Sequence, residues 1–539
     1  MRRLVREGSA LKPITRENLR WYHVVLVALI LWLISFFTLG FVGLISPLTE
    51  WFMASPLLIK VAGIGIFASF TFILYSFLRY GRGLRRGGAG YGLLLLIVFS
   101  LIYAGGYAAM LNNSPSEIEV ISLDHAINTT STRLIPLHTA YAYAISMLQT
   151  PTHTLYEEET YIYYDSSRNI IYNWVIEPEG FWNEISRNAE GAVFVNGSVF
   201  PPEVKIFKED LKWGIHKLVG TPFFLDNLWR ELKLRAGLGV RVLMDCNVEV
   251  YRNGSIYIII PLASWKTSLT TSVPYVVGYA VVSPDGAIDI VSVDEARKND
   301  LFRGVPLVPD IIARRWVEIY RFYTGLIPVI LYHNTFTIRD VGMNPQPYLM
   351  TDSKGNLFWV FVAEPPGETA SAKYIFYVNA SDTHPHIMIY ELPRPAIGIS
   401  RIESLIKQAH PTYDWGEFNI AEPMPLILNS TLYWKVSVIT LDGRGVVSVD
   451  LVDTEKNEVI SIQPGKKLTA EDIVNRIKKI YQETPEGNES VQSIIQRIKE
   501  LKDMIQKQQA ELQKLYEELE ELEKMLADVL SNSSIGAGG

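Results

Sequence analysis

Residues 91–111 read YGLLLLIVFSLIYAGGYAAML, a run of 21 residues without a charged side chain. At a rise of ~1.5 Å per residue, an apolar helix of about 20 residues crosses the ~30 Å hydrocarbon core of a bilayer. Two earlier runs, Trp21 to Ile45 and Leu57 to Leu78, have similar length and composition. We therefore predict three membrane-spanning helices within residues 21–111. The first reads as an uncleaved signal anchor, because its apolar stretch exceeds that of a signal peptide.

The distribution of charge predicts how these helices are oriented. Residues 1–90 contain 11 Lys and Arg against 3 Asp and Glu, whereas the other 449 residues contain 39 against 54. Cytoplasmic segments carry the excess of Lys and Arg, and here all of these residues except Lys60, near the start of the second run, precede the first run or lie between the second and third. We expect residues 1–20 in the cytoplasm, an outside loop around residues 47–54, and export of the chain after residue 111. This explanation leaves no need for a nucleic-acid partner.

N-glycosylation motifs support the same topology. Eight Asn-x-Ser/Thr motifs occur in the chain, and all of them follow residue 111. The single cysteine, Cys246, rules out an intramolecular disulfide, and only five glutamines occur in the first 490 residues. Because heat-adapted chains avoid both residue types, we expect a glycoprotein of an archaeal cell surface. The candidate glycosylation sites are Asn112, Asn128, Asn196, Asn253, Asn379, Asn429, Asn488 and Asn532.

The exported region, residues 116–483, alternates helical and strand-like segments. In the clearest unit, a helical stretch from Ile399 to Ala409 precedes alternating strands over residues 432–438 and 445–450, which a turn at Asp442-Gly443 joins. An amphipathic helix must cover the apolar face of a small antiparallel sheet. We therefore predict a membrane-anchored α+β protein whose ectodomain repeats helix-plus-antiparallel-sheet units. Three looser units begin with helices at Pro136 to Leu148, Leu225 to Arg235 and Asp310 to Tyr323.

The last of these units, Ile399 to Ile462, resembles the PepSY and cystatin-like families. In those families a helix packs on a sheet whose strands carry Tyr/Trp-x-Val and Val-Asp motifs, here Trp434-Lys435-Val436 and Val449-Asp450. The resemblance implies a binding or peptidase-inhibiting module. It carries over no catalytic residue.

Residues 491–530 carry a heptad pattern typical of a coiled coil. Apolar residues alternate steps of four and three, with Gln508 as the single polar position. Such a helix needs a partner for its apolar stripe, which is either further copies of this chain, its own ectodomain or another protein. A linker, residues 484–490, precedes the coil, and a tail, residues 531–539, is expected to be disordered. The seam comprises Ile494, Ile498, Leu501, Ile505, Gln508, Leu512, Leu515, Leu519, Leu522, Leu526 and Val529.

No catalytic, cofactor or metal motif stands out. His384-Pro385-His386 lacks a third ligand, so we expect a solvated surface pair, and Cys246 in its strand-like context should be a small buried hydrophobe. We expect no cofactor and a non-enzymatic scaffold or assembly role in the envelope, at the plasma membrane. One alternative is a PepSY-like module that inhibits or senses a membrane-associated peptidase, and another is an extracellular hydrolase. The expected partners are the lipid bilayer, further copies of the chain, and other envelope proteins or a peptidase.

Overall fold

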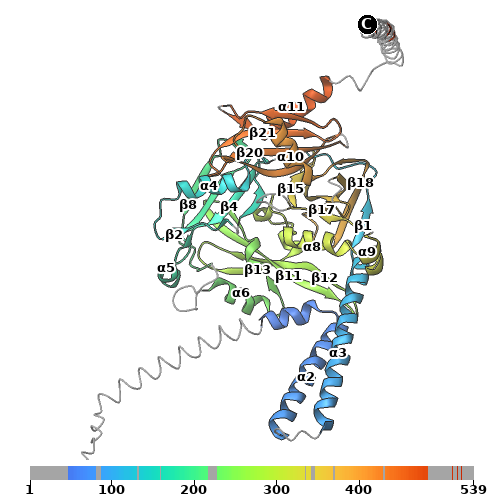
Figure 1. Ribbon diagram of the computed structural model, residues 1–539. Coiled ribbons are helices and arrows are strands. Elements are labelled where there is room, and N and C mark those ends of the chain that lie inside the picture. Colours follow the sequence, from blue (N-terminus) through green and yellow to red (C-terminus); the bar gives the residue numbers. More distant parts are fainter. Residues whose placement is uncertain are drawn as a thin grey trace, which may run out of the picture. The chain divides into compact units, whose positions relative to one another are not determined.

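The computed structural model describes residues 46–80, 86–129, 133–157, 160–215, 227–333, 335–340, 346–367, 371–428, 431–465 and 467–483, together with Gln513, Leu519 and Lys524 (Figure 1). The chain forms two compact units, Met1–Asp472 and Ile473–Gly539, and the description below concerns the first. Outside the described residues lie the first expected membrane span, the linker at 484–490, the tail at 531–539 and, except for Leu519, the heptad seam.

Two helices are long and apolar enough to cross a membrane, α2 (Leu57–Tyr80) and α3 (Arg86–Asn113). They pack antiparallel, with the Phe99 ring of α3 against Gly65 of α2, where an added Cβ would meet the ring at 2.3 Å. Their remaining surface is open, since Phe67 is 73% and Leu101 68% exposed. The core helix of a soluble protein would bury such side chains. The structure therefore supports membrane association through the second and third predicted runs.

The loop predicted around residues 47–54 is a helix, described from Ser46 to Ala54. The prediction rested on the absence of basic residues in this segment, which carries no information about the contacts that hold a helix in place. The Lys233 ammonium pairs with the Glu50 carboxylate, and the Thr49 hydroxyl donates to the Leu238 carbonyl at 2.7 Å. These bonds tie the helix before α2 to the folded domain.

Four sheets make up most of the described domain; three are antiparallel and the third is mixed, and apart from β1 the strands of each sheet follow a helix in the chain (Figure 1). The first sheet is β3 (Tyr161–Tyr164), β4 (Ile170–Val175), β6 (Gly191–Asn196) and β8 (Val204–Lys208), after α4 (Leu137–Met147). The second is β10 (Val248–Arg252), β11 (Ser255–Thr267), β12 (Ser272–Val282) and β13 (Ile288–Ser292), with β9 (Arg241–Val242) beside β11, after α6 (Leu228–Ala236).

The third sheet follows α8 (Asp310–Tyr320) and α9 (Leu326–Tyr332), and the fourth follows α10 (Ile399–Ala409). In the third sheet the order is β1-β18-β17-β16-β14, and β15 also pairs with β16. The strands are β1 (Glu119–Ser122), β14 (Thr337–Ile338), β15 (Tyr348–Thr351), β16 (Leu357–Glu364), β17 (Ser371–Asn379) and β18 (His386–Ile397). The fourth sheet is β19 (Phe418–Leu428), β20 (Thr431–Thr440), β21 (Val446–Asp453) and β22 (Glu458–Ile462).

Short elements complete the fold. α5 (Phe181–Ser186), α7 (Val293–Ala296), η1 (Ser114–Glu117), η3 (Met244–Cys246) and η4 (Asp300–Phe302) lie in connections. Two small ladders pair β2 (His153–Thr154) with β5 (Glu177–Pro178), and β7 (Val199–Phe200) with β23 (Leu468–Thr469). Helix α11 (Ala470–Glu483) begins directly after β23.

The helices do not all cover the sheet that follows them. α4 packs on β6 and β8 of its own sheet, and α10 contacts β19 and β22 as well as β17. In contrast, α8 packs chiefly on β12 of the preceding sheet, where the Trp316 indole donates to the Pro274 carbonyl at 2.7 Å. A helix whose apolar stripe is wide enough contacts two layers, so α8 joins the second and third sheets.

Strand β1 links this arrangement to the membrane helices. α3 continues through η1 into β1, which pairs parallel to β18 from Glu119 opposite His386 to Ser122 opposite Ile389. The third sheet therefore begins where α3 ends.

Two expectations about single residues are wrong. Cys246 ends the 3₁₀ turn η3 rather than lying in a strand, although it is buried as expected. His386 is buried at the start of β18, and its Nδ1 lies 2.9 Å from the His384 carbonyl oxygen. A solvated histidine pair does not form, because β17 and β1 flank β18 and enclose its first residue.

Candidate anion-binding site

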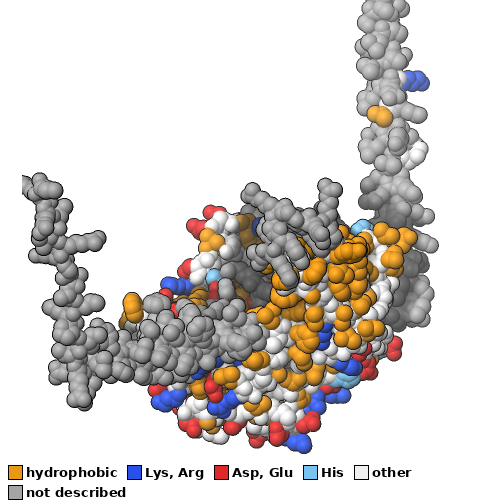
Figure 2. Space-filling view, turned by 90° about the horizontal axis from the view of Figure 1, so that it is seen from below, with side chains coloured by type: hydrophobic (Ala, Val, Ile, Leu, Met, Phe, Trp, Pro, Cys, Tyr) orange, Lys and Arg blue, Asp and Glu red, His pale blue; other side chains and the backbone are white. Residues whose placement is uncertain are grey.

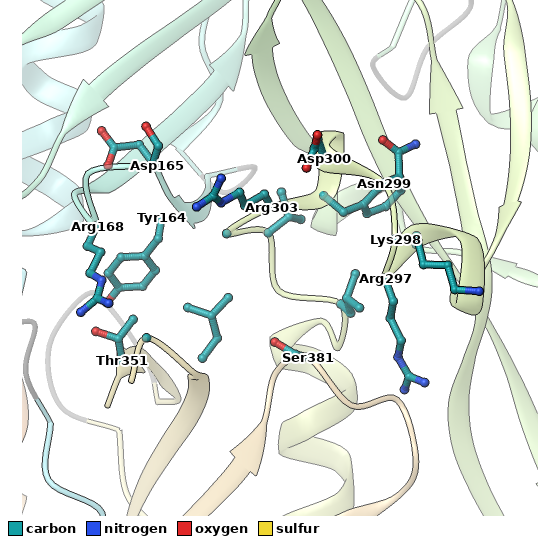
Figure 3. A pocket seen from close by; sticks show the side chains of 18 of the residues that line it. Tyr164, Asp165, Arg168, Arg297, Lys298, Asn299, Asp300, Arg303, Thr351 and Ser381 are labelled. Carbon is teal, nitrogen blue, oxygen red and sulfur yellow. The ribbon is translucent and has the colours of Figure 1, made fainter. Parts of the chain in front are cut away.

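Four connections from different parts of the domain enclose a polar cleft of about 450 Å³ (Figure 3). They are the β3–β4 turn, the segment from α7 through η4 to Leu307, the β15–β16 turn, and the turn after β17, which contributes Ser381. This volume lies within the ~300–1,000 Å³ typical of small-molecule sites. We call it the basic cleft.

Two of the connections are turns of the same kind. The β3–β4 turn reads Asp165-Ser-Ser-Arg-Asn169, and the β15–β16 turn reads Asp352-Ser-Lys-Gly-Asn356. In each turn, the Asp Oδ1 accepts from two backbone N–H groups, and the other Asp oxygen accepts from the Asn amide. Because each Asp is engaged by its own turn, it holds the turn and leaves the residues between Asp and Asn pointing outward.

Gly304 lets the segment from α7 to Leu307 approach the β3–β4 turn. Its carbonyl accepts from the Tyr164 N–H at 2.9 Å, and an added Cβ would lie 1.9 Å from the Tyr164 carbonyl oxygen. Its φ of +80° also lies in the region that favours glycine. Only glycine fits here, so Gly304 fixes the distance between the two sides of the cleft.

The rim of the cleft is positively charged. Five cations line it against two carboxylates, Asp165 and Asp300. Arg297 pairs with Asp382 at 3.1 Å. Among the described residues, the other four cations have no carboxylate within 4.0 Å. These four exposed cations, which we call the rim cations, are Arg168, Lys298, Arg303 and Lys354.

The arrangement of the rim cations suits an anion. Figure 3 shows the Arg303 side chain in the middle of the cleft, between the turn that carries Asp165 and Arg168 and the segment that carries Lys298. The Arg168 guanidinium crosses to the second turn, where an added Cβ on Gly355 would lie 3.3 Å from Nη2. Guanidinium groups bind phosphate, sulfate and carboxylate through paired hydrogen bonds, whereas ammonium groups act as point charges. The cleft offers both guanidinium and ammonium groups.

The floor of the cleft is apolar. Phe302, Val305, Leu307 and Leu357 line it and are at most 6% exposed. A ligand with a carbon skeleton and acidic substituents would contact both floor and rim. The cleft has no cluster suited to a cation: among the described residues, no three His, Cys, Asp or Glu side chains gather as metal ligands.

A second group of charges is buried beneath the fourth sheet. Glu422 lies at a bulge in β19, 3.6 Å from the Arg133 guanidinium, and its carboxylate caps α4 by accepting from the Leu137 N–H at 2.7 Å. The Lys435 ammonium donates to the Ser437 hydroxyl at 2.8 Å. Burial lowers the pKa of Lys435 to about 8. These side chains, the interior cluster, are at most 2% exposed, so they are out of reach of a ligand.

The candidate residues from the sequence do not meet at the cleft. Burial raises the pKa of the Cys246 thiol, whose Sγ lies 3.8 Å from Asp310 Oδ1, so it is not an activated nucleophile. Of the candidate glycosylation sites, Asn112, Asn128 and Asn253 are exposed, while Asn196 and Asn379 are half-buried and accept from Ser198 and Ser381 N–H groups. Asn429, Asn488 and Asn532 lie outside the described residues.

Sequence reasoning missed the rim cations because it searched for catalytic motifs. The signal was present as the repeated Asp-Ser-x-x-Asn turn at 165–169 and 352–356, each with a basic residue inside it. Comparisons with protein-family models, curated proteins and solved structures find no match for this chain.

Proposed function

We propose that this chain is a membrane-anchored, non-enzymatic binding and scaffold component of the cell envelope, whose basic cleft holds an anionic ligand. The observation that carries the proposal is that four exposed cations without carboxylate partners line one cleft. They come from three connections of a chain whose residues 91–539 carry 39 basic against 54 acidic side chains. Clustered exposed cations repel one another, and a bound anion offsets that cost.

The class of ligand follows from the lining. A molecule with several phosphate, sulfate or carboxylate groups would engage the rim cations, while its carbon skeleton would contact Phe302 and Leu307. Acidic glycans of a cell surface have this chemistry. The lining holds more bases than acids, which favours binding over the paired carboxylates that a glycoside hydrolase needs.

The scaffold part of the proposal rests on how the domain is attached. Helix Ser46–Ala54 is bonded to the domain before α2, and α3 passes into β1 of the third sheet. The β11–β12 turn also accepts from the first N–H groups of α2, Leu57 to Ser268 at 3.0 Å and Leu58 to Leu269 at 3.2 Å. Three such connections hold the domain in a fixed orientation against the membrane helices. A ligand in the cleft would then be held at a fixed height and angle.

Calorimetric titration of the full chain in phosphatidylcholine nanodiscs tests the binding proposal. A sulfated hexasaccharide and inorganic tripolyphosphate serve as probes. Replacing Arg168, Lys298 and Lys354 by Glu together should lower the affinity for the bound probe at least about tenfold, about 1.4 kcal/mol, since three attractive charges become repulsive. The affinity of the original chain should also fall as salt rises.

The matched control changes the same net charge elsewhere. Lys205, Arg401 and Arg444 are exposed and do not line the cleft. Their joint replacement by Glu should leave the affinity within about twofold, because exposed charges at a distance are screened. An equal loss in both variants would show a nonspecific charge effect, and binding of neither probe would refute the proposal for these ligand classes.

We further propose that the domain is extracellular and glycosylated, and that the C-terminal heptads assemble copies of the chain. The eight glycosylation motifs after residue 111 and the unbroken seam support these statements. Deletion of residues 490–539 should convert an oligomer in detergent to a monomer. Mass spectrometry of native material should find glycans at exposed sites such as Asn128 and Asn253. An unchanged size or unmodified sites would contradict the respective statement.

The PepSY-like alternative has one structural observation in its favour. The last unit consists of α10 packed beside four consecutive antiparallel strands, β19 to β22, which is the layout that the resemblance implies. Such a module would inhibit or sense a membrane-associated peptidase. Purification from native membranes should then recover a peptidase whose rate falls when this chain is added, whereas an unaffected peptidase would exclude the alternative.

A further inference from the structure

The segment after α8 exposes an unusual apolar surface. Residues 322–338 contain no Asp, Glu, Lys or Arg, and α9 lies at their centre with the sequence LIPVILY. Ile327, Ile330, Leu331 and Tyr332 are each at least 60% exposed, while Val329 alone in this helix is buried. Single exposed apolar residues are ordinary, but a contiguous group marks an interaction surface.

α9 lies beside the end of a membrane helix. The Leu326 N–H at its start donates to Asn112 Oδ1 at 3.2 Å, and α9 also contacts α3. The uncharged run of α3 extends from Tyr91 to Leu111. At ~1.5 Å per residue this run is about 31 Å long and matches the hydrocarbon core. The exposed side chains of α9 are therefore placed where α3 leaves the hydrocarbon.

Two further apolar groups lie at the same end of the domain. At the tip of the β11–β12 turn, Leu269 is 59% exposed while its carbonyl accepts from Leu58 at the start of α2. In the helix before α2, Leu48 and Phe52 are also exposed. Figure 2, which views this end of the molecule, shows hydrophobic side chains over much of the face and most charged ones toward its edge. We call α9, Leu269 and Leu48 with Phe52 the juxtamembrane surface.

We propose that the juxtamembrane surface inserts into the interfacial layer of the bilayer, so that the folded domain makes a monotopic contact with lipid in addition to its membrane-spanning helices. Lipid is the occupant because the bilayer that surrounds α3 must border α9, which is bonded to α3 at Asn112. The same bilayer must border Leu269, which is bonded to α2. Apolar side chains at this depth lose contact with water on insertion, which is favourable.

The contact between the juxtamembrane surface and lipid constrains the orientation of the domain relative to the bilayer. A domain fixed to α2 and α3 can still tilt together with these helices about the point where they leave the bilayer. Insertion of α9 on one side and of the helix Ser46–Ala54 on another adds lipid contacts away from that point. The bilayer plane then sets the tilt of the domain.

Site-directed labelling measures the insertion directly. Cys246 is the single cysteine and is buried, so a thiol-reactive nitrobenzoxadiazole probe will report on a new cysteine. The full chain with Ile330→Cys or Leu331→Cys is reconstituted in phosphatidylcholine vesicles. Quenching by lipids with a nitroxide on the acyl chain should approach that of Phe67→Cys in α2, within about twofold. Quenching by aqueous iodide should be at least about fivefold weaker than for Asp294→Cys, whose side chain is exposed on a short helix of the domain.

Each result of the quenching experiment either supports or overturns the proposal. Strong quenching by iodide would show that α9 lies in water and would overturn the proposal. Protection from both quenchers would show that a protein surface covers α9, which would also overturn it. Two labelled positions guard against a substitution that perturbs the helix, because Ile330 and Leu331 are both exposed and neither fills the core.

Discussion

The basic cleft and the interior cluster both contain Arg and Lys side chains, but these are exposed in the cleft and buried in the cluster. In the cleft, Arg168 and Lys354 are exposed and among the described residues have no carboxylate within 4.0 Å. In the interior cluster, Arg133 and Lys435 are almost fully buried; Arg133 pairs with the Glu422 carboxylate, and the Lys435 ammonium donates to the Ser437 hydroxyl. A buried charge must be compensated within the fold, whereas an exposed charge remains available to a ligand. Changes in the cluster should therefore affect stability, and changes in the cleft should affect binding.

The largest effect is expected from Glu422→Ala. It removes the carboxylate that pairs with the buried Arg133 guanidinium and the cap of α4, so the free energy of unfolding should fall by about 4 kcal/mol. Denaturant unfolding in detergent measures this. The matched control is Glu403→Ala, which breaks the exposed pair with Lys407 and should change stability by less than about 0.5 kcal/mol. Equal effects would show that burial does not separate the two regions.

The Lys435 amine should make stability depend on pH. Burial lowers its pKa in the folded chain to about 8, from 10.5 in the unfolded chain, so the unfolded chain binds more protons between these values. Stability should therefore rise from pH 8 to 10.5 by about 3 kcal/mol, with the full cost of the buried charge present below pH 8. In Lys435→Met this rise should disappear from thermal unfolding curves. An identical pH profile in both chains would contradict the assignment.

Gly304→Ala should lower both stability and anion binding, because it strains the backbone that shapes the cleft. The new Cβ would meet the Tyr164 carbonyl at 1.9 Å at a φ of +80°, and the loss of stability should be about 2 kcal/mol with weaker anion binding. Gly237→Ala provides the control, since Gly237 has a φ of +98° but open space around it. It should cost about 1 kcal/mol and leave binding unchanged.

The smallest effect is expected from Lys354→Ala. Loss of one exposed ammonium should weaken binding of the anionic probe about threefold, about 0.7 kcal/mol, and alter stability by less than about 0.5 kcal/mol. Parallel titration and thermal unfolding of the same sample separate these quantities. A large loss of stability would show that Lys354 supports the fold, which would weaken the distinction between cleft and cluster.

The fold was more accessible from the sequence than the site was. Periodicity predicted the helix from Ile399 to Ala409, which is α10, and the strands that became β20 and β21, because burial of one face imposes a regular spacing. The rim cations lie on turns, where no period applies, and Arg168 and Lys354 are 186 positions apart in the chain. Whether these two side chains come together depends on how the sheets pack against each other. The burial of Lys435 was equally unpredictable from the sequence, since a lysine in an alternating strand ordinarily faces solvent.

The parallel pairing of β1 with β18 has a mechanical consequence. β1 follows α3 directly, and its residues 119–122 run alongside residues 386–389 in the same direction. A force that draws the domain away from the bilayer pulls β1 along its own axis. The bonds from Glu119 to Pro385 and from Leu123 to Ile389 are then loaded together in shear, rather than opened one after another. Tension between the domain and α3 would thus be resisted by the third sheet as a whole.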